Sequence, residues 1–428
     1  MTASPTVAVY LFPCVVGGGL GDVAEVWDAG RILARAGFPI YLYRATGRPP
    51  VQGADTRLGR PRLVPLDRPL GGPLPALTIA PDWGVSAVPS RPEPFGRAGP
   101  WAAEAAAIES AHGPARTIHV SLGEFARTLP AREEVRERYR EGGVPARAIR
   151  SATRGPGFAR EVEQYRTLYA RFRAFDRPNV LHLFPTFVPR HAFARDYPAA
   201  VETGPLWPDR YRRTGPSGRT GADWFWYASP VSARRIVPAV ARALHSVRPS
   251  ATLTVVMAAP PPDGDRPANV RYLAAGAQPE RRWRAWFERS EMRIVTGSRT
   301  LLEALELGRP FLYFNGILGE GRRKRRHRPE KIESLLAAWK REGVDPRRQN
   351  DLRLFSGGRS VEAVVTRAAR RAGPWRRRRW SPPTPRFPLP YADAGAVLVA
   401  VARALAASPT SAEAIVQAVR ERRPPPWP

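Results

Sequence analysis

Short apolar runs alternate with segments of helical periodicity along most of this 428-residue chain, and this alternation constrains the fold more than any other feature. The first 43 residues show the pattern. Val7–Phe12 is a continuous apolar run suited to a strand buried on both faces, residues 23–36 have helical spacing, and residues 39–43 form a second apolar run. Parallel strands need such helical crossovers, so the sequence predicts an α/β fold with parallel sheets.

The same alternation recurs after a turn-rich stretch at 203–222, which indicates two domains. We expect doubly wound, Rossmann-like domains over 1–210 and 222–375, facing each other across a cleft, with residues 45–75 irregular. Further strands are expected at 76–80, 117–122, 180–184, 224–228, 252–257, 270–273 and 293–295, and helices near 101–111, 124–140, 158–175, 232–246, 279–290, 330–342, 360–371, 392–407 and 411–421. Residues 376–428 are expected to comprise a Pro/Arg-rich segment and terminal helices that cross back to the first domain.

Arginine dominates the charge of the chain, whose net charge is +30. Only Lys324, Lys331 and Lys340 are lysines among the 68 basic residues. A strongly positive field attracts anionic partners, but arginine is spread through every segment and no nucleic-acid-binding module is recognisable, so specific nucleic-acid recognition is not predicted. Cys14 is the only cysteine, which excludes an intrachain disulfide and a multi-cysteine metal site. Without a transmembrane-length apolar run or signal-peptide pattern, a cytoplasmic protein is expected.

Residues 296–316 carry the clearest functional pattern: a strand end, a small-residue turn, a short helix and a second strand. Gly297, Ser298 and Thr300 stand where the helix begins, so backbone N–H groups and hydroxyls there can meet an anion. Glu303 follows one turn later, within reach of a sugar hydroxyl. Parallel α/β sheets hold nucleotides at such strand ends, although the same pattern suits an ordinary crossover.

Two other loops follow predicted strands in the same way. Gly17–Asp22 comes after the first strand, and its glycines allow close approach of a ligand. The same glycine loop is compatible with a dinucleotide-binding fingerprint, in which Arg44 would bind the 2′-phosphate of NADP. A tight turn between strand and helix, without a ligand, is a further interpretation. In the second half, Ser229, Ser232 and Arg235 join a strand to its helix, with Ser232 as the expected N-cap. Of the histidines, His112, His119 and His182 are possible bases, and core packing is the better interpretation of His119.

The segment Gly18-Gly-Leu-Gly-Asp-Val-Ala-Glu25 resembles the opening signature of glycogen and starch synthases, and residues 296–316 resemble the donor loop of GT-B-fold glycosyltransferases. Among proteins of that fold, residues 296–316 are more similar to inverting N-acetylglucosaminyltransferases of the peptidoglycan type than to the synthases. The resemblance implies a metal-independent glycosyltransferase that takes a nucleoside-diphosphate sugar as substrate and needs no cofactor. It implies Asp22 as the base, and donor contacts at Gly18, Gly19, Gly21, Ser229, Ser232, Arg235, Gly297, Ser298, Arg299, Thr300, Glu303 and Asn315.

Two alternatives to a transferase stay open on the same fold: a catalytically inactive binding or assembly protein, and a sugar-nucleotide epimerase. The basic run Arg322–Arg328 follows Asn315, at the carboxyl end of a predicted strand. A solvated run is one interpretation. The other is contact with a phosphorylated donor, or with an anionic acceptor at the inner face of the membrane.

Overall fold

The structure is a computed structural model, and its described part falls into two compact units. The first unit draws on Met1–Tyr139, Thr153–Asp209 and Leu389–Pro428, and the second on Arg140–Ala152 and Arg210–Pro388. The structure describes residues 6–12, 21–43, 64–66, 69–70, 72–81, 100–122, 177–185, 200–203, 206, 223–228, 236–257, 267–274, 280–295, 300, 304, 311–313, 316–317, 326–327, 362–363, 365–370 and 394–421.

The first unit is built on a seven-stranded sheet in the order β3-β2-β1-β4-β5-β6-β7, in which every pairing is parallel. Its strands are β1 (Ala8–Leu11), β2 (Ile40–Tyr43), β3 (Val64–Leu66), β4 (Ala76–Pro81), β5 (Thr117–Leu122), β6 (Val180–Pro185) and β7 (Ala200–Thr203). Successive strands are added toward one edge of the sheet from β1 to β3, and toward the opposite edge from β4 to β7. The direction in which strands are added therefore reverses between the neighbours β1 and β4.

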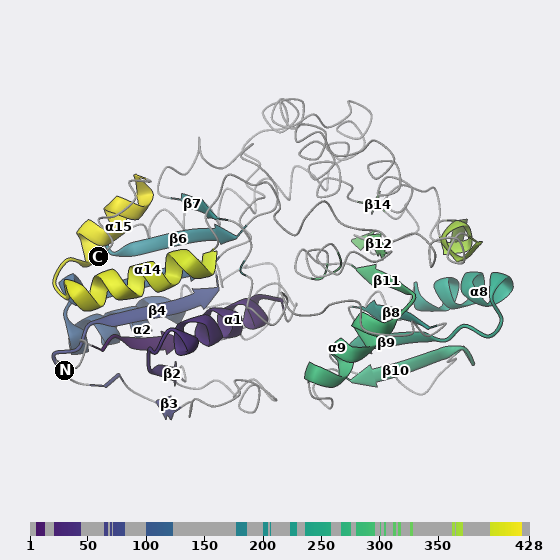
Figure 1. The fold of residues 1–428 in the computed structure, drawn as a ribbon, viewed down its shortest axis with the longest axis horizontal. Coiled ribbons are helices and arrows are strands. Elements are labelled where there is room, and N and C mark those ends of the chain that lie inside the picture. Colours follow the sequence, from purple (N-terminus) through teal and green to yellow (C-terminus); the bar gives the residue numbers. More distant parts are fainter. Residues whose placement is uncertain are drawn as a thin grey trace. The chain divides into compact units, whose positions relative to one another are not determined.

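Helices cover both faces of this sheet, as a doubly wound fold requires (Figure 1). Alternate strand residues such as Val9 and Leu77 belong to one core with α1 (Gly21–Arg35), α14 (Ala394–Ala407) and α15 (Ala412–Arg420). Residues of the opposite pleat, such as Ala8 and Tyr10, pack with α2 (Pro100–His112), which a short 3-10 turn, η1 (Pro114–Arg116), joins to β5. The alternation of side chains along each strand thus divides the residues between two cores.

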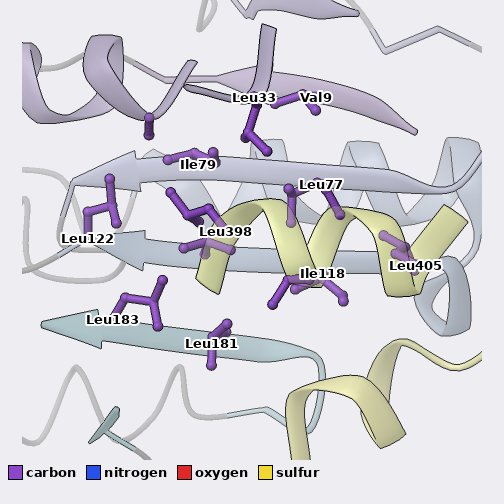
Figure 2. Packing of buried hydrophobic residues seen from close by; sticks show 14 of the residues in the cluster. Val9, Leu33, Leu77, Ile79, Ile118, Leu122, Leu181, Leu183, Leu398 and Leu405 are labelled. Carbon is purple, nitrogen blue, oxygen red and sulfur yellow. The ribbon is translucent and has the colours of Figure 1, made fainter. Parts of the chain in front are cut away.

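The two terminal helices lie on the first sheet, far from their neighbours in sequence. Helix α14 packs beside α1, and α15 contacts β5, β6 and β7. Figure 2 shows Leu398 and Leu405 of α14 lying over the strands that carry Leu77 and Ile118. Helix α14 contains a single charged residue, Arg403, so burial against an apolar sheet face is the main source of its stability.

The second unit holds a five-stranded parallel sheet in the order β10-β9-β8-β11-β12. Its strands are β8 (Trp224–Tyr227), β9 (Leu253–Met257), β10 (Val270–Ala274), β11 (Met292–Val295) and β12 (Phe311–Tyr313). One face packs against α8 (Val237–Val247) and the helical residues 365–370. The other face meets α9 (Glu280–Arg289), where the rings of Phe225 and Phe287 are 5.4 Å apart in an edge-to-face arrangement.

A two-stranded antiparallel hairpin, β13 (Gly316–Ile317) and β14 (Arg326–His327), follows β12. None of the helices in the described part of the chain is long and apolar enough to cross a membrane.

The fold class predicted from the sequence, two doubly wound α/β domains, is confirmed by these strand orders and by helices on both faces. The prediction that residues 45–75 are irregular is wrong, because strand β3 lies within them. The sequence analysis also did not predict β7 or the β13–β14 hairpin. The domain limits 1–210, 222–375 and 376–428, and the cleft, stay predictions. The helices expected at 124–140, 158–175 and 330–342 lie outside the described residues.

Candidate functional site

The order of the second sheet reverses between β8 and β11, which are hydrogen-bonded neighbours. In open parallel sheets, ligands bind beyond the carboxyl ends of the strands at such a reversal, because the connections leave toward opposite faces and open a crevice. Residues 229–235 come after β8, which ends at Tyr227, with only Ala228 between them, and residues 296–299 directly follow Val295, the last residue of β11. The two loops assigned to the donor therefore begin at the two strands that flank the reversal.

The segment after β11 matches the predicted strand–turn–helix order where it is described. Val295 ends the strand, Thr300 is helical and partly exposed, and Ala304 is helical and buried. Residues 296–299, between Val295 and the helical Thr300, lie outside the described residues. Most of the residues predicted for the donor lie outside the described residues: Ser229, Ser232, Arg235, Gly297, Ser298, Arg299, Glu303 and Asn315.

The prediction that Ser232 caps the following helix is wrong. Helix α8 begins at Val237, Ile236 occupies the N-cap position, and no side chain caps the helix. Pro238 lies in the first turn, where its missing N–H is harmless, so proline rather than serine marks this start. The connection from β8 to α8 is correspondingly longer than the sequence suggested, because residues 229–235 all precede the helix.

The first unit has its own reversal, between β1 and β4, and the predicted glycine loop follows β1 there. Gly18 and Gly19 lie outside the described residues, whereas Gly21 and Asp22 are the first two residues of α1. Helix α1 lies very close to its strand, because a Cβ on Gly30 would stand 2.4 Å from Cδ1 of Leu11. Gly37, with φ of +95°, ends the helix as predicted: Phe38 N–H donates to Leu33 O and Gly37 N–H to Ala34 O.

The histidines considered as bases belong to buried networks in the first unit. His112 Nδ1 lies 2.8 Å from the carbonyl oxygen of Leu74, which can only accept, so Nδ1 carries the proton. Its Nε2 then accepts from the Tyr10 hydroxyl at 2.7 Å, and that hydroxyl oxygen accepts from Leu70 N–H at 3.0 Å. Burial lowers the pKa of His112, and this outweighs the opposing hydrogen bond to Leu74. A neutral imidazole therefore fits the network.

His119 is wholly buried in β5 and satisfied at both nitrogens, which confirms the interpretation of core packing. Its Nε2 lies 3.0 Å from Oε1 of Glu109, so Nε2 carries the proton, and Nδ1 accepts from the Thr78 hydroxyl at 2.7 Å. Burial lowers the pKa of His119 despite the opposing effect of Glu109. The order Thr–His–Glu is that of a nucleophilic triad, but Thr78 and His119 have no exposed surface for a substrate to reach.

Glu109 joins this network to the turn before β6. Arg177 donates to both carboxylate oxygens at 2.9 and 3.1 Å, and Asn179 Nδ2 donates to Oε1 at 2.8 Å. Burial by itself raises the pKa of Glu109, but hydrogen bonds from His119 and Asn179 and the charge of Arg177 outweigh it and lower the pKa to about 2. Because His119 is neutral, its contribution is a hydrogen bond rather than an ion pair. The turn before β6 marks the amino end of the sheet, opposite the glycine loop.

The remaining candidate, His182 in β6, lies beside Ser121 in the sheet register and is wholly buried. Burial, with a smaller effect of the charge of Arg420, lowers its pKa to about 3. The three histidines are therefore structural groups of the first core, and none of them stands at the carboxyl edge. A neutral, buried imidazole is a poor base for a ligand beyond that edge.

Sequence reasoning missed a wholly buried arginine in the second unit. Arg293 of β11 stands in register with Phe225 of β8 and Phe311 of β12, and its guanidinium lies 5.4 Å from the ring centre of Phe287. It donates to the carbonyl oxygen of Glu288 at 2.7 Å. Aromatic faces attract guanidinium groups, which accounts for a charge at this position. The apolar neighbours of Arg293 in the sequence concealed it.

Among the described residues, no group of three or more His, Cys, Asp or Glu side chains is arranged to hold a metal ion. Comparisons with known proteins found no matching family model and no matching curated protein. The chain is similar in fold to WaaG, a glycosyltransferase involved in lipopolysaccharide biosynthesis, with 13% identity, a TM-score of 0.41, and coverage of 85% of this chain and 98% of that one.

Two further solved structures show a similarity of the same kind. A ugt transferase from Siraitia grosvenorii in complex with UDP has 12% identity, a TM-score of 0.40, and coverage of 97% and 99%. A putative UDP-N-acetylglucosamine 2-epimerase from Listeria monocytogenes has 10% identity, a TM-score of 0.40, and coverage of 92% and 95%. The resemblance to glycosyltransferases seen in the sequence thus recurs among solved structures, while the fold assignment rests on the strand orders of the chain itself.

Proposed function

We propose that this protein is a glycosyltransferase that transfers a sugar from a nucleoside-diphosphate donor to an acceptor. One observation carries the proposal: the loops 229–235 and 296–299 follow the two strands that flank the order reversal of the second sheet. A phosphate beyond those strand ends would meet the N-terminus of the helix that contains Thr300 and the small residues Gly297 and Ser298. Glu303, one turn further on, would bond the ribose.

The departing diphosphate needs positive charge, and this chain offers it without a metal. Backbone N–H groups at the helix N-terminus and the guanidinium of Arg235 would stabilise the charge that develops on the leaving phosphate. In the first unit, the loop after β1 and Asp22 at the start of α1 would meet the acceptor, with the carboxylate as base. The protein would then need no cofactor, and the nucleotide-sugar is a substrate.

We place this activity in the cytoplasm, with peripheral contact to the anionic inner face of the membrane. The net charge of +30 supports this placement, because a polycationic protein binds to an acidic membrane surface. Added salt screens the charges and weakens this binding.

Isothermal calorimetry against a panel of nucleoside diphosphates tests the donor site. Binding of one nucleotide by the intact chain is expected, and Glu303→Ala should weaken it by about 1–3 kcal/mol, because ribose hydroxyls lose their partner. Glu413→Ala, at an exposed position of α15, is the matched control and should bind as the parent does. Unchanged affinity in Glu303→Ala would remove this residue from the site, and no binding to any nucleotide would overturn the proposed function.

Product analysis separates transfer from the two alternatives. The donor is incubated without acceptor, and then with candidate acceptors, and the sugar products are resolved by chromatography. An isomerised sugar without acceptor identifies an epimerase. Nucleotide binding with no product under any condition identifies a binding protein.

A further inference from the structure

The connection that leads into β4 lies on the surface of the first unit, where apolar packing holds little of it. It is described over residues 69–70 and 72–75, which we call the connection segment. Only Pro75 of these residues is buried, and Leu74 is the one large apolar side chain that is exposed in the described part of the chain. A segment with few buried contacts opens locally at a lower free-energy cost than the sheet does. Its attachment therefore depends strongly on hydrogen bonds.

Three hydrogen bonds in series tie the connection segment to β1 and α2. Leu70 N–H donates to the hydroxyl oxygen of Tyr10 at 3.0 Å. The Tyr10 hydroxyl donates to Nε2 of His112 at 2.7 Å, and Nδ1–H of His112 donates to the carbonyl oxygen of Leu74 at 2.8 Å. The imidazole therefore holds one part of the segment directly and the other through Tyr10.

This series of hydrogen bonds requires a neutral imidazole. Each group donates in the same direction along the chain, an arrangement in which hydrogen bonds strengthen one another. In the imidazolium both ring nitrogens carry hydrogen, so Nε2 can no longer accept from Tyr10. The Tyr10 oxygen would then receive hydrogens from both His112 and Leu70, while its own hydrogen would lose Nε2 as its acceptor. Protonation of His112 thus breaks the middle bond of the series.

We propose that His112 and Tyr10 form an acid-sensitive latch, which holds the connection segment while His112 is neutral and releases it when His112 binds a proton. Release frees the backbone of Leu70 and Leu74 and exposes His112 to solvent. The latch stands at the amino end of β4, because the segment directly precedes that strand. The proposed sugar transfer is assigned to the carboxyl edges of the sheets, so the latch is independent of that function.

The surroundings of His112 give an imidazolium no compensating charge. The connection segment has no titratable side chain, and Arg116 of η1 donates to its Pro73 carbonyl oxygen at 3.0 Å, which adds a positive charge on that side. Among the described residues, no carboxylate contacts His112; Glu109 of the same helix is bound by Arg177 instead. Burial accordingly lowers the pKa of His112. The elements around His112 contribute these titratable or charged side chains: Tyr10 of β1, Tyr41 of β2, Glu109 of α2, Arg116 of η1 and the neutral His119 of β5.

The pH at which the latch opens follows from the difference between the two states. Once released, His112 is exposed and regains its ordinary pKa of 6.5, whereas in the attached state its pKa is lower. The released state therefore binds more protons than the attached state below pH 6.5. The latch is at full strength above that pH, and release becomes up to about tenfold more favourable for each pH unit below it, until the lowered pKa is reached.

Amide hydrogen exchange of the full-length chain, resolved to single residues, tests the latch. Rates at pH 7.5, 6.5 and 5.5 are divided into the intrinsic rates at the same pH, which gives protection factors. In the parent, protection of the Leu70 amide should fall by up to about tenfold between pH 7.5 and 5.5 and should stay below that of the β4 amides throughout. A constant value for Leu70 would overturn the proposal. Protection equal to that of β4 would do so too, because the segment would then open only with the whole unit.

Two histidine variants assign the effect. His112→Gln cannot bind a proton at this position, so its Leu70 protection should no longer change with pH. His182→Gln is the matched control, because it removes another buried histidine of the same unit, and it should keep the fall at Leu70. A fall that persists in His112→Gln, or that disappears only in His182→Gln, would overturn the latch.

Two further measurements do not depend on the folding of His112→Gln. Tyr10→Phe keeps the ring but removes the hydroxyl, so the Leu70 amide should lose about tenfold or more of its protection at pH 7.5; unchanged protection would remove Tyr10 from the latch. A ¹⁵N NMR titration of the parent should show His112 as the Nδ1–H tautomer at pH 7.5, with a midpoint below 6.5. The Nε2–H tautomer, or a midpoint at 6.5, would contradict the proposed series of hydrogen bonds.

Discussion

Arg420, in the last helix, donates a hydrogen bond of 2.8 Å to the carbonyl oxygen of Val180, the first residue of β6. The same nitrogen donates to the carbonyl of Arg177 at 3.1 Å. The side chains of Arg177 and Asn179 bind Glu109 of α2 on the other side of the turn. One short turn is thus held from one side by α2 and from the other by α15, which ties the last helix to this unit.

Arg420→Ala should destabilise the first unit by about 1–3 kcal/mol, because two partly buried carbonyl groups lose a charged donor. Urea unfolding followed by circular dichroism measures the effect. Arg403→Ala, at an exposed position of α14, is the control and should change the unfolding free energy by no more than about 0.5 kcal/mol. Equal midpoints for Arg420→Ala and the parent would mean that apolar packing alone holds α15.

Replacing His182 should reduce the acid sensitivity of the protein. Its pKa falls from 6.5 to about 3 on folding because of burial and, secondarily, the charge of Arg420. The unfolded chain therefore binds a proton below pH 6.5 that the folded chain does not bind until about pH 3. Stability from this residue is complete above pH 6.5 and falls by about 1.4 kcal/mol per pH unit as the pH drops through that window.

His182→Gln should reduce the slope by this amount, measured as unfolding free energy from urea titrations between pH 7 and pH 4.5, while the lowered pKa values of His112 and His119 keep part of the pH dependence. His245→Gln, at an exposed position of α8, is the control and should retain the slope. Staying above pH 4.5 keeps Glu109 out of the comparison, because its stabilising effect is lost between its ordinary pKa of 4.5 and its folded value of about 2. Identical slopes in parent and His182→Gln would show that His182 is protonated in the folded state.

Gly30→Ala should destabilise the contact between α1 and β1. The added Cβ would stand 2.4 Å from Cδ1 of Leu11, which is wholly buried and can move only by displacing its neighbours. Overpacking costs about 1–3 kcal/mol, and the better helix propensity of alanine recovers about 1. Thermal unfolding measures the net loss. The double variant Gly30→Ala with Leu11→Val makes room for the methyl group, and coupling between the two changes is expected; simple additivity would contradict the predicted clash.

Arg293→Met should cost little stability, and Arg293→Ala much more. Methionine fills the space among Phe225, Phe287 and Phe311 without a buried charge, and exchanging a buried charge for an apolar side chain is often neutral or stabilising. Alanine leaves a cavity, at about 2–5 kcal/mol. Urea unfolding monitored by tryptophan fluorescence suits this test, because Trp224 and Trp226 lie in the same sheet. A larger loss for methionine than for alanine would show that the charge itself stabilises the sheet.

The repeating pattern of strands and helices could be predicted from local sequence alone. A strand buried on both faces favours a continuous apolar run, so Val7–Phe12 was recognisable as a strand without any partner. Gly37 could be identified as a helix end because a left-handed residue is needed there. Parallel pairing followed from the helical crossovers. Each of these properties depends on residues close together in the chain.

Contacts between segments far apart in the chain, in contrast, became known only from the folded protein. The apolar composition of α14 shows that this helix must be buried. The hydrophobic effect is non-directional, so the residues of α14 do not specify that its neighbour is α1. His119 could be predicted as buried, whereas its partners Thr78 and Glu109 come from another strand and a helix and depend on register. Strand β3 has three residues, too few for a periodic pattern, and pairs only because β2 presents a free edge. Burial can be read from local sequence, but the choice of partner is a property of the assembled sheet.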